Sequence, residues 1–157
     1  MKPTDFRAVA IVALGLLGLP AMGYAAGTSS NDEPAQPDLY QQAEELIDDE
    51  DYAEAIPLLQ QSIQEKGEYA DALNPLGYAN RKLGDKAKAM TYYTKALNLE
   101  PNHLGANGYL GELYLEMNDL PKAEERLAVL KTACGDCDEF DDLEDEIEDY
   151  KEEHGLS

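Results

Sequence analysis

Hydrophobic residues in the segment 37–153 recur at the spacing of one helix face, and short polar breaks divide them into successive stripes. The clearest break is Gly84-Asp85, where a helix-ending glycine precedes an aspartate suited to start the next helix. The stretch 70–103 is therefore predicted to hold two helices. Their apolar stripes are Leu73, Leu76, Ala79 and Leu83 in the first helix, and Ala89, Tyr93, Ala96 and Leu97 in the second.

This arrangement recurs without a gap at an offset of 34 residues, which aligns Asp51 with Asp85 and Asp119. Stacked repeats of this length bury their apolar faces against one another, and three are enough for a stable stack. The sequence therefore predicts an all-α repeat domain at 37–153. Its units lie at about 36–69, 70–103 and 104–137.

Aligned polar and small residues predict local details of each unit. Asp51, Asp85 and Asp119 are each expected to cap the second helix of their unit, because a carboxylate there accepts from unpaired backbone N–H groups. Gly77 and Gly111 are expected to leave room for the paired helix, where a larger side chain would overpack the interface.

The repeat resembles the tetratricopeptide repeat (TPR) family, whose pattern is a large residue, Leu-Gly, an aromatic residue, and then Ala, an aromatic residue and Pro. Asn80 stands where that pattern usually has Tyr, and Gly67 and Gly135 stand where Pro is usual. The resemblance implies a right-handed α-solenoid of three TPRs. The middle unit carries it best, at Leu73, Leu76, Gly77, Ala89, Tyr93, Ala96 and Pro101.

Beyond the repeats, the segment 138–153 continues the helical pattern with apolar residues at spacings of three, four and three. It is expected to cap the last repeat and to turn its many acidic residues outward. Pro57 and Pro75 are expected within about the first turn of their helices, where a missing N–H has no intrahelical partner to lose. The apolar residues of the cap are Phe140, Leu143, Ile147 and Tyr150.

The start of the chain follows a different pattern. Lys2 and Arg7 precede an apolar run from Ala8 to Leu19, and small residues follow, which predicts a signal peptide at 1–25 and cleavage after Ala25. The apolar run has 12 residues, whereas about 20 are needed to span a bilayer, so no permanent membrane anchor is expected. The polar stretch 26–36 is predicted to be a flexible linker. The protein is therefore expected to be exported, to the periplasm or alternatively to the medium.

The chain is strongly acidic, with 33 Asp and Glu against 12 Lys and Arg and a formal charge of −21. A polyanion such as nucleic acid would be repelled, so nucleic-acid binding is excluded as a function. Basic partners and cations are favoured instead.

Cys134 and Cys137 are the residues that suggest chemistry. In an oxidising compartment, two thiols this close are expected to form a disulfide that locks the turn before the cap. Thiol-redox exchange and metal binding are the alternatives. Redox exchange of the thioredoxin kind needs a preceding strand, and a metal site needs further ligands, whereas His103 and His154 are each isolated. No catalytic set, cofactor motif or metal site is predicted, and the protein is not expected to be an enzyme.

The family resemblance also implies a binding groove lined mainly by the first helix of each unit. This groove favours the function of an adaptor or scaffold that binds another protein or peptide with a basic or aromatic segment. The alternative is a thiol-redox or metal-handling accessory protein that uses Cys134 and Cys137. Under a second interpretation of the groove, its tyrosines pack between helices and its basic residues only balance acids. The predicted groove residues are Tyr40, Glu44, Asn74, Tyr78, Arg81, Lys82, Tyr109 and Glu112.

Overall fold

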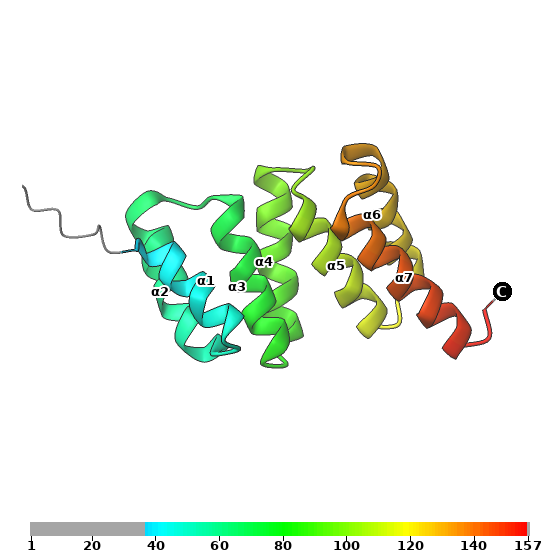
Figure 1. Cartoon of the computed structure of the whole chain (residues 1–157), viewed down its shortest axis with the longest axis horizontal. Helices are drawn as coiled ribbons and strands as arrows, with labels where there is room; N and C mark the ends of the chain where they lie inside the picture. Colours follow the sequence, from blue (N-terminus) through cyan, green and yellow to red (C-terminus); the bar gives the residue numbers. More distant parts are fainter. Residues whose placement is uncertain (1–36, 157) are drawn as a thin grey trace, which may run out of the picture. The chain divides into compact units, whose positions relative to one another are not determined.

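The computed structural model describes residues 37–156, which form seven α-helices and contain no strand (Figure 1). The predicted all-α fold is confirmed for this part of the chain. The predicted signal peptide 1–25 and the predicted linker 26–36 lie outside the described residues and stay predictions. The helices are α1 (Leu39–Asp48), α2 (Tyr52–Lys66), α3 (Ala70–Lys82), α4 (Lys86–Leu99), α5 (Leu104–Glu116), α6 (Leu120–Ala133) and α7 (Asp138–Glu153).

The helices pack in chain order, two to each 34-residue unit (Figure 1). Within a unit, the first helix packs on the second, as α3 does on α4. Between units, α1 contacts α3, α3 contacts α5, and α5 contacts α7. The C-terminal helix α7 thus packs where the first helix of a further unit would lie, and it covers both α5 and α6. Within residues 37–156, no helix combines the length and apolar character needed to cross a bilayer.

The core runs along the stack as successive clusters that bridge neighbouring units. Leu59 of the first unit packs with Leu76 of the second, and Tyr93 of the second packs with Leu113 of the third. Leu143 of α7 continues the series against the last unit. Because each cluster joins two units, apolar burial stabilises the units only together.

The small residues on the first helices meet different neighbours from unit to unit. A Cβ added to Gly77 would lie 2.5 Å from Cε1 of Tyr93, on the second helix of the same unit, as predicted. A Cβ added to Gly111 would instead overlap the side chain of Leu143 on α7. The nearest neighbour of Gly111 is thus on the cap helix, which packs directly on α5.

Each turn from first to second helix uses one residue in the left-handed region. Glu50, Gly84 and Asn118 have φ of 64°, 85° and 60°, at equivalent positions of the three units. The next residue's N–H closes the first helix, as Asp85 N does by donating to Asn80 O at 2.8 Å. This is the Schellman arrangement, which favours glycine at the left-handed position because a Cβ is strained there.

The predicted aspartate caps are formed in one unit of the three. Asp85 Oδ1 accepts from the backbone N–H of Lys88 at 3.1 Å. Asp51 and Asp119 occupy the same position, but their carboxylates accept no backbone N–H there, and Asp119 pairs with the Lys122 ammonium instead. The prediction was right for Asp85 and wrong for the other two, because side-chain rotamers are set by each turn's own neighbours.

The two helical prolines lie deeper than predicted. Pro57 and Pro75 are each the sixth residue of their helix, α2 and α3, and so lie past the first turn. The carbonyls of Ala53 and Asp71, four residues earlier, therefore lack their usual helical donor. Tertiary packing holds these helices despite the lost hydrogen bonds.

Candidate functional site

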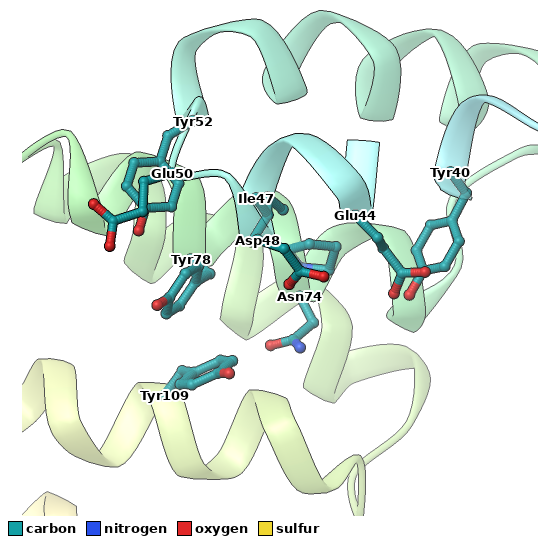
Figure 2. A pocket seen from close by; sticks show the side chains of 10 residues that line it. Tyr40, Glu44, Ile47, Asp48, Glu50, Tyr52, Asn74, Tyr78 and Tyr109 are labelled. Carbon is teal, nitrogen blue, oxygen red and sulfur yellow. The ribbon is translucent and has the colours of Figure 1, made fainter. Parts of the chain in front are cut away.

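The face formed by the first helices and α7 is hollowed in two places. The hollow near the start of the stack, here called the tyrosine pocket, has a volume of about 600 Å³ (Figure 2). The second, here called the acidic hollow, has about 540 Å³. The tyrosine pocket is lined by Tyr40, Glu44, Ile47, Asp48, Glu50, Tyr52, Asn74, Pro75, Tyr78 and Tyr109. The acidic hollow is lined by Arg81, Lys82, Glu112, Leu115, Glu116, Asn118, Glu146, Asp149, Tyr150, Glu153 and His154.

The eight predicted groove residues all line one of these two hollows, but not the same one. Arg81, Lys82 and Glu112 line the acidic hollow. The other five, which line the tyrosine pocket, are Tyr40, Glu44, Asn74, Tyr78 and Tyr109. The structure thus separates an aromatic half of the face from a half that contains both basic residues.

Sequence reasoning missed residues outside the first helices. Glu50 lies in the turn after α1 and Tyr52 begins α2, yet both reach the tyrosine pocket. Glu146 and Tyr150 belong to the cap helix and line the acidic hollow. The helical periodicity of α7 was a usable signal, since a helix packed like a further first helix must extend the same face.

Three tyrosines from three helices form a ladder across the tyrosine pocket (Figure 2). The rings of Tyr52 and Tyr78 lie 5.9 Å apart at 73°, and those of Tyr78 and Tyr109 lie 4.7 Å apart. Such tilted and edge-to-face pairs are favourable for aromatic rings. The rings therefore pack between units, as the second interpretation of the groove expects, and they also line the pocket.

Arg81 is built into the contact between the second and third units. Its side chain is 8% exposed, and its Nη2 lies 2.6 Å from Oε2 of Glu112. Its Nη1 lies 3.6 Å from Oε1 of Glu116, and its guanidinium lies 5.6 Å from the ring centroids of Tyr78 and Tyr109. Arg81 is thus already engaged with internal acids and rings. Lys82 is exposed, with its Nζ 5.6 Å from the Tyr78 centroid.

Burial and nearby acids keep the phenols protonated. Burial first, and then the adjacent Glu44 carboxylate, raise the pKa of Tyr40 above its ordinary value. Burial also raises the pKa of Tyr109. In the acidic hollow, burial and then Glu112 raise the pKa of Glu146. The tyrosine pocket therefore presents neutral rings and hydroxyls beside its carboxylates.

Cys134 and Cys137 lie in the turn between α6 and α7, away from both hollows, and the structure joins them as a disulfide. Cys134 ends α6 and Cys137 precedes α7, so the bond ties the last repeat to its cap. In the described part of the chain, no three metal-ligating side chains gather in one place.

Two family models match the sequence, and both are described as tetratricopeptide repeat. One matches residues 40–103 and the other residues 80–144. Together they span two thirds of the chain. The chain belongs to the tetratricopeptide-repeat family. No curated protein sequence matches this TPR protein.

Solved structures share the TPR fold. The type III secretion translocator chaperone SycD of Yersinia enterocolitica is 16% identical, with a TM-score of 0.65 over 74% of this chain and 83% of that chain. SycD in complex with a peptide of the translocator YopD is 19% identical, with a TM-score of 0.63 over 75% and 90%. A TPR protein of Parabacteroides merdae is 19% identical, with a TM-score of 0.64 over 80% of this chain and 50% of that chain. At these identities the likeness establishes the fold alone.

Proposed function

We propose that this TPR protein is a non-catalytic adaptor or scaffold of the cell envelope that holds another protein or peptide on the face formed by α1, α3, α5 and α7. The observation that carries the proposal is the tyrosine pocket, where phenol rings and carboxylates meet on the face that first helices provide in this family. Tyrosines are enriched at the energetic centres of protein interfaces.

The charge of the two hollows indicates the kind of partner. Eight acidic residues line them, against Arg81 and Lys82. A basic segment would therefore be attracted and oriented by this face, and an aromatic residue in the segment would pack on the tyrosine ladder. The acidic residues are Glu44, Asp48, Glu50, Glu112, Glu116, Glu146, Asp149 and Glu153.

The solved structures that share this fold are compatible with a protein that binds a peptide. SycD, which shares the fold, has been crystallised with a peptide of another protein. Fold alone does not assign a partner, so SycD's own partner is not carried over. The envelope location rests on the predicted signal peptide, and N-terminal sequencing of the mature protein should begin at Ala26; an intact Met1 in the purified protein would contradict it.

The binding face is tested with two matched substitutions on one helix. Glu44 and Glu45 are both exposed on α1, but Glu44 lines the tyrosine pocket and Glu45 does not. The partner would first be found by cross-linking in cells with the full-length chain and mass spectrometry, and then purified. Glu44→Trp should weaken its binding by calorimetry at least tenfold, because the indole fills the pocket, whereas Glu45→Trp should leave it unchanged. Equal affinities for both variants would place the binding surface elsewhere.

A further inference from the structure

We propose that the tyrosine pocket receives one cationic side chain of the partner, a lysine ammonium or an arginine guanidinium, among the rings of Tyr52 and Tyr78 and the carboxylates of Asp48 and Glu50. The inference rests on the proposed function, because it takes the partner to lie on this face. It goes beyond that function by naming the half of the face that binds the cation and the side chains that contact it.

The carboxylates of the pocket are free to bind a cation. Glu44, Asp48 and Glu50 are all exposed, and none forms an ion pair with any residue in 37–156. No Lys, Arg or His is among the residues that line the pocket. Three like charges around one hollow repel one another, and a cation between them relieves that repulsion.

The acidic hollow differs in this respect. There Arg81 pairs with Glu112 and Glu116, and Glu116 also pairs with Lys86 at 2.9 Å. Two of its five acids thus pair with cations of the same chain, and Arg81 and Lys82 line this hollow beside the three acids that form no ion pair within residues 37–156. Cation recognition is therefore assigned to the tyrosine pocket and not to the acidic hollow.

The phenol rings add a second attraction for a cation. Ring faces attract ammonium and guanidinium groups within about 6 Å, and aromatic cages bind such groups in this way. Tyr78 already has two cationic groups of the same chain near its ring, the Arg81 guanidinium and the Lys82 Nζ, each 5.6 Å from its centroid, so this ring interacts with cations in the folded protein. No Lys or Arg of the described residues lies over the ring of Tyr52, which remains open to one from a partner.

The pocket also holds an acceptor without a donor. Asn74 Oδ1 is buried and accepts no hydrogen bond from residues 37–156. Figure 2 shows the Asn74 amide between the tyrosine ladder and the acids of α1. Buried acceptors are nearly always satisfied in folded proteins, and an ammonium or guanidinium brings several donors.

Glu50 is the residue least expected at its position. Its backbone is left-handed, and the equivalent positions carry Gly84 and Asn118, two residue types that tolerate this conformation better. Strained residues cluster at functional sites, where the surrounding structure maintains them. Glu50 lines the pocket, and in Figure 2 its carboxylate lies beside Tyr52, on the side away from Asp48.

The test uses N-acetyl-arginine amide as the probe and N-acetyl-citrulline amide as its neutral isostere. The mature chain, labelled with ¹³C at its tyrosines, is titrated with each probe while the ring resonances are followed by NMR. The arginine probe should shift Tyr52 and Tyr78 saturably, and the citrulline probe should not. Raising the salt to 0.5 M should weaken the arginine binding, because these carboxylates are exposed.

Glu50→Asn removes the charge but keeps a residue that suits the left-handed turn, as Asn118 does. It should weaken arginine binding by about two- to fivefold, the effect expected of one exposed ion pair. Glu45→Gln removes the same charge from α1 outside the pocket and should leave the affinity unchanged. Thermal melting confirms that both variants are folded before titration.

Equal affinity for the arginine and citrulline probes would overturn the inference, as would an equal effect of Glu50→Asn and Glu45→Gln. Either result would leave the proposed function standing if Glu44→Trp still blocked the partner. Conversely, the arginine probe could shift the tyrosine resonances while the partner binds the Glu44→Trp variant with unchanged affinity. That result would overturn the proposed function and the assignment of the cation to the partner. The pocket would still bind a cation.

Discussion

Arg81 on α3 and Glu112 on α5 form a salt bridge of 2.6 Å, and the arginine side chain is 8% exposed. The pair joins the second and third repeats at the centre of the face on which a partner is proposed to bind. The same arginine touches the rings of Tyr78 and Tyr109, which belong to the tyrosine ladder. Arg81 therefore holds the residues of this face in place through internal contacts. Its substitution is expected to change the stability of the fold, so stability is measured first.

Arg81→Leu should lower the free energy of unfolding by about 3 kcal/mol, because it leaves the largely buried Glu112 without its cation. Urea unfolding followed by circular dichroism measures the change. The double variant Arg81→Leu with Glu112→Leu should regain most of the loss, since no unpaired charge then remains. As the control, Lys95→Leu breaks an exposed pair with Glu68 and should change stability by less than about 1 kcal/mol.

Glu50→Gly should raise the free energy of unfolding by about 1 kcal/mol, because glycine adopts the left-handed conformation without strain. Gly84→Ala at the equivalent position should lower it by a similar amount, since the alanine acquires that strain. Thermal unfolding of both variants checks the pair. Opposite signs are expected; a stabilised Gly84→Ala would contradict the assigned turn.

Gly77→Ala should cost about 1–3 kcal/mol, because the new Cβ would meet the buried ring of Tyr93. Gly108→Ala is the matched control on another first helix. Its Cβ would meet Glu139 Cβ at an ordinary 3.4 Å, so the higher helix propensity of alanine should add up to about 1 kcal/mol. Equal effects of the two substitutions in urea unfolding would show that Tyr93 moves aside freely.

Glu146→Gln should increase stability at neutral pH and flatten its pH dependence. Burial and Glu112 raise the pKa of Glu146, so the folded protein holds this proton more tightly than the unfolded chain does. Stability therefore falls as the pH rises from the ordinary value of 4.5 through the higher folded-state pKa. Unfolding curves between pH 4 and 8 measure this slope. Glu148→Gln removes the same charge from the same helix and controls for net charge.

The mature protein should contain no reactive thiol under non-reducing conditions, because Cys134 and Cys137 are joined. Reduction should cost about 2 kcal/mol of stability, the chain-entropy value for so short a loop. Thiol titration and unfolding with and without reductant check both statements. The double change of Cys134 and Cys137 to Ser should keep partner binding; two titratable thiols in the exported protein would instead favour the redox or metal hypothesis.

Much of the proposed binding face could be predicted from the sequence, because the 34-residue repeat fixes which positions fall on the first helices. Tyr78 and Tyr109 are predicted to line the face by their place in the first helices, and both do. Tyr52 and Glu50 escaped prediction, since a turn residue and a helix-start residue have no fixed direction in the repeat pattern. Arg81 lay on the expected face, but its burial beneath Glu112 depends on α5, which begins 23 residues later.

The sequence by itself determined the helices, the 34-residue register and the position of the cap, because helical periodicity and turn residues act over a few neighbouring positions. The tertiary structure alone decided which carboxylates cap helices, which side chain lies against Gly111 and which charged residues form ion pairs within the chain. These outcomes depend on side-chain directions and on contacts between units, where the neighbour is distant in sequence. The separation of an acidic pocket without basic residues around the tyrosines from a hollow in which Arg81 and Lys82 lie among the acids is of this second kind.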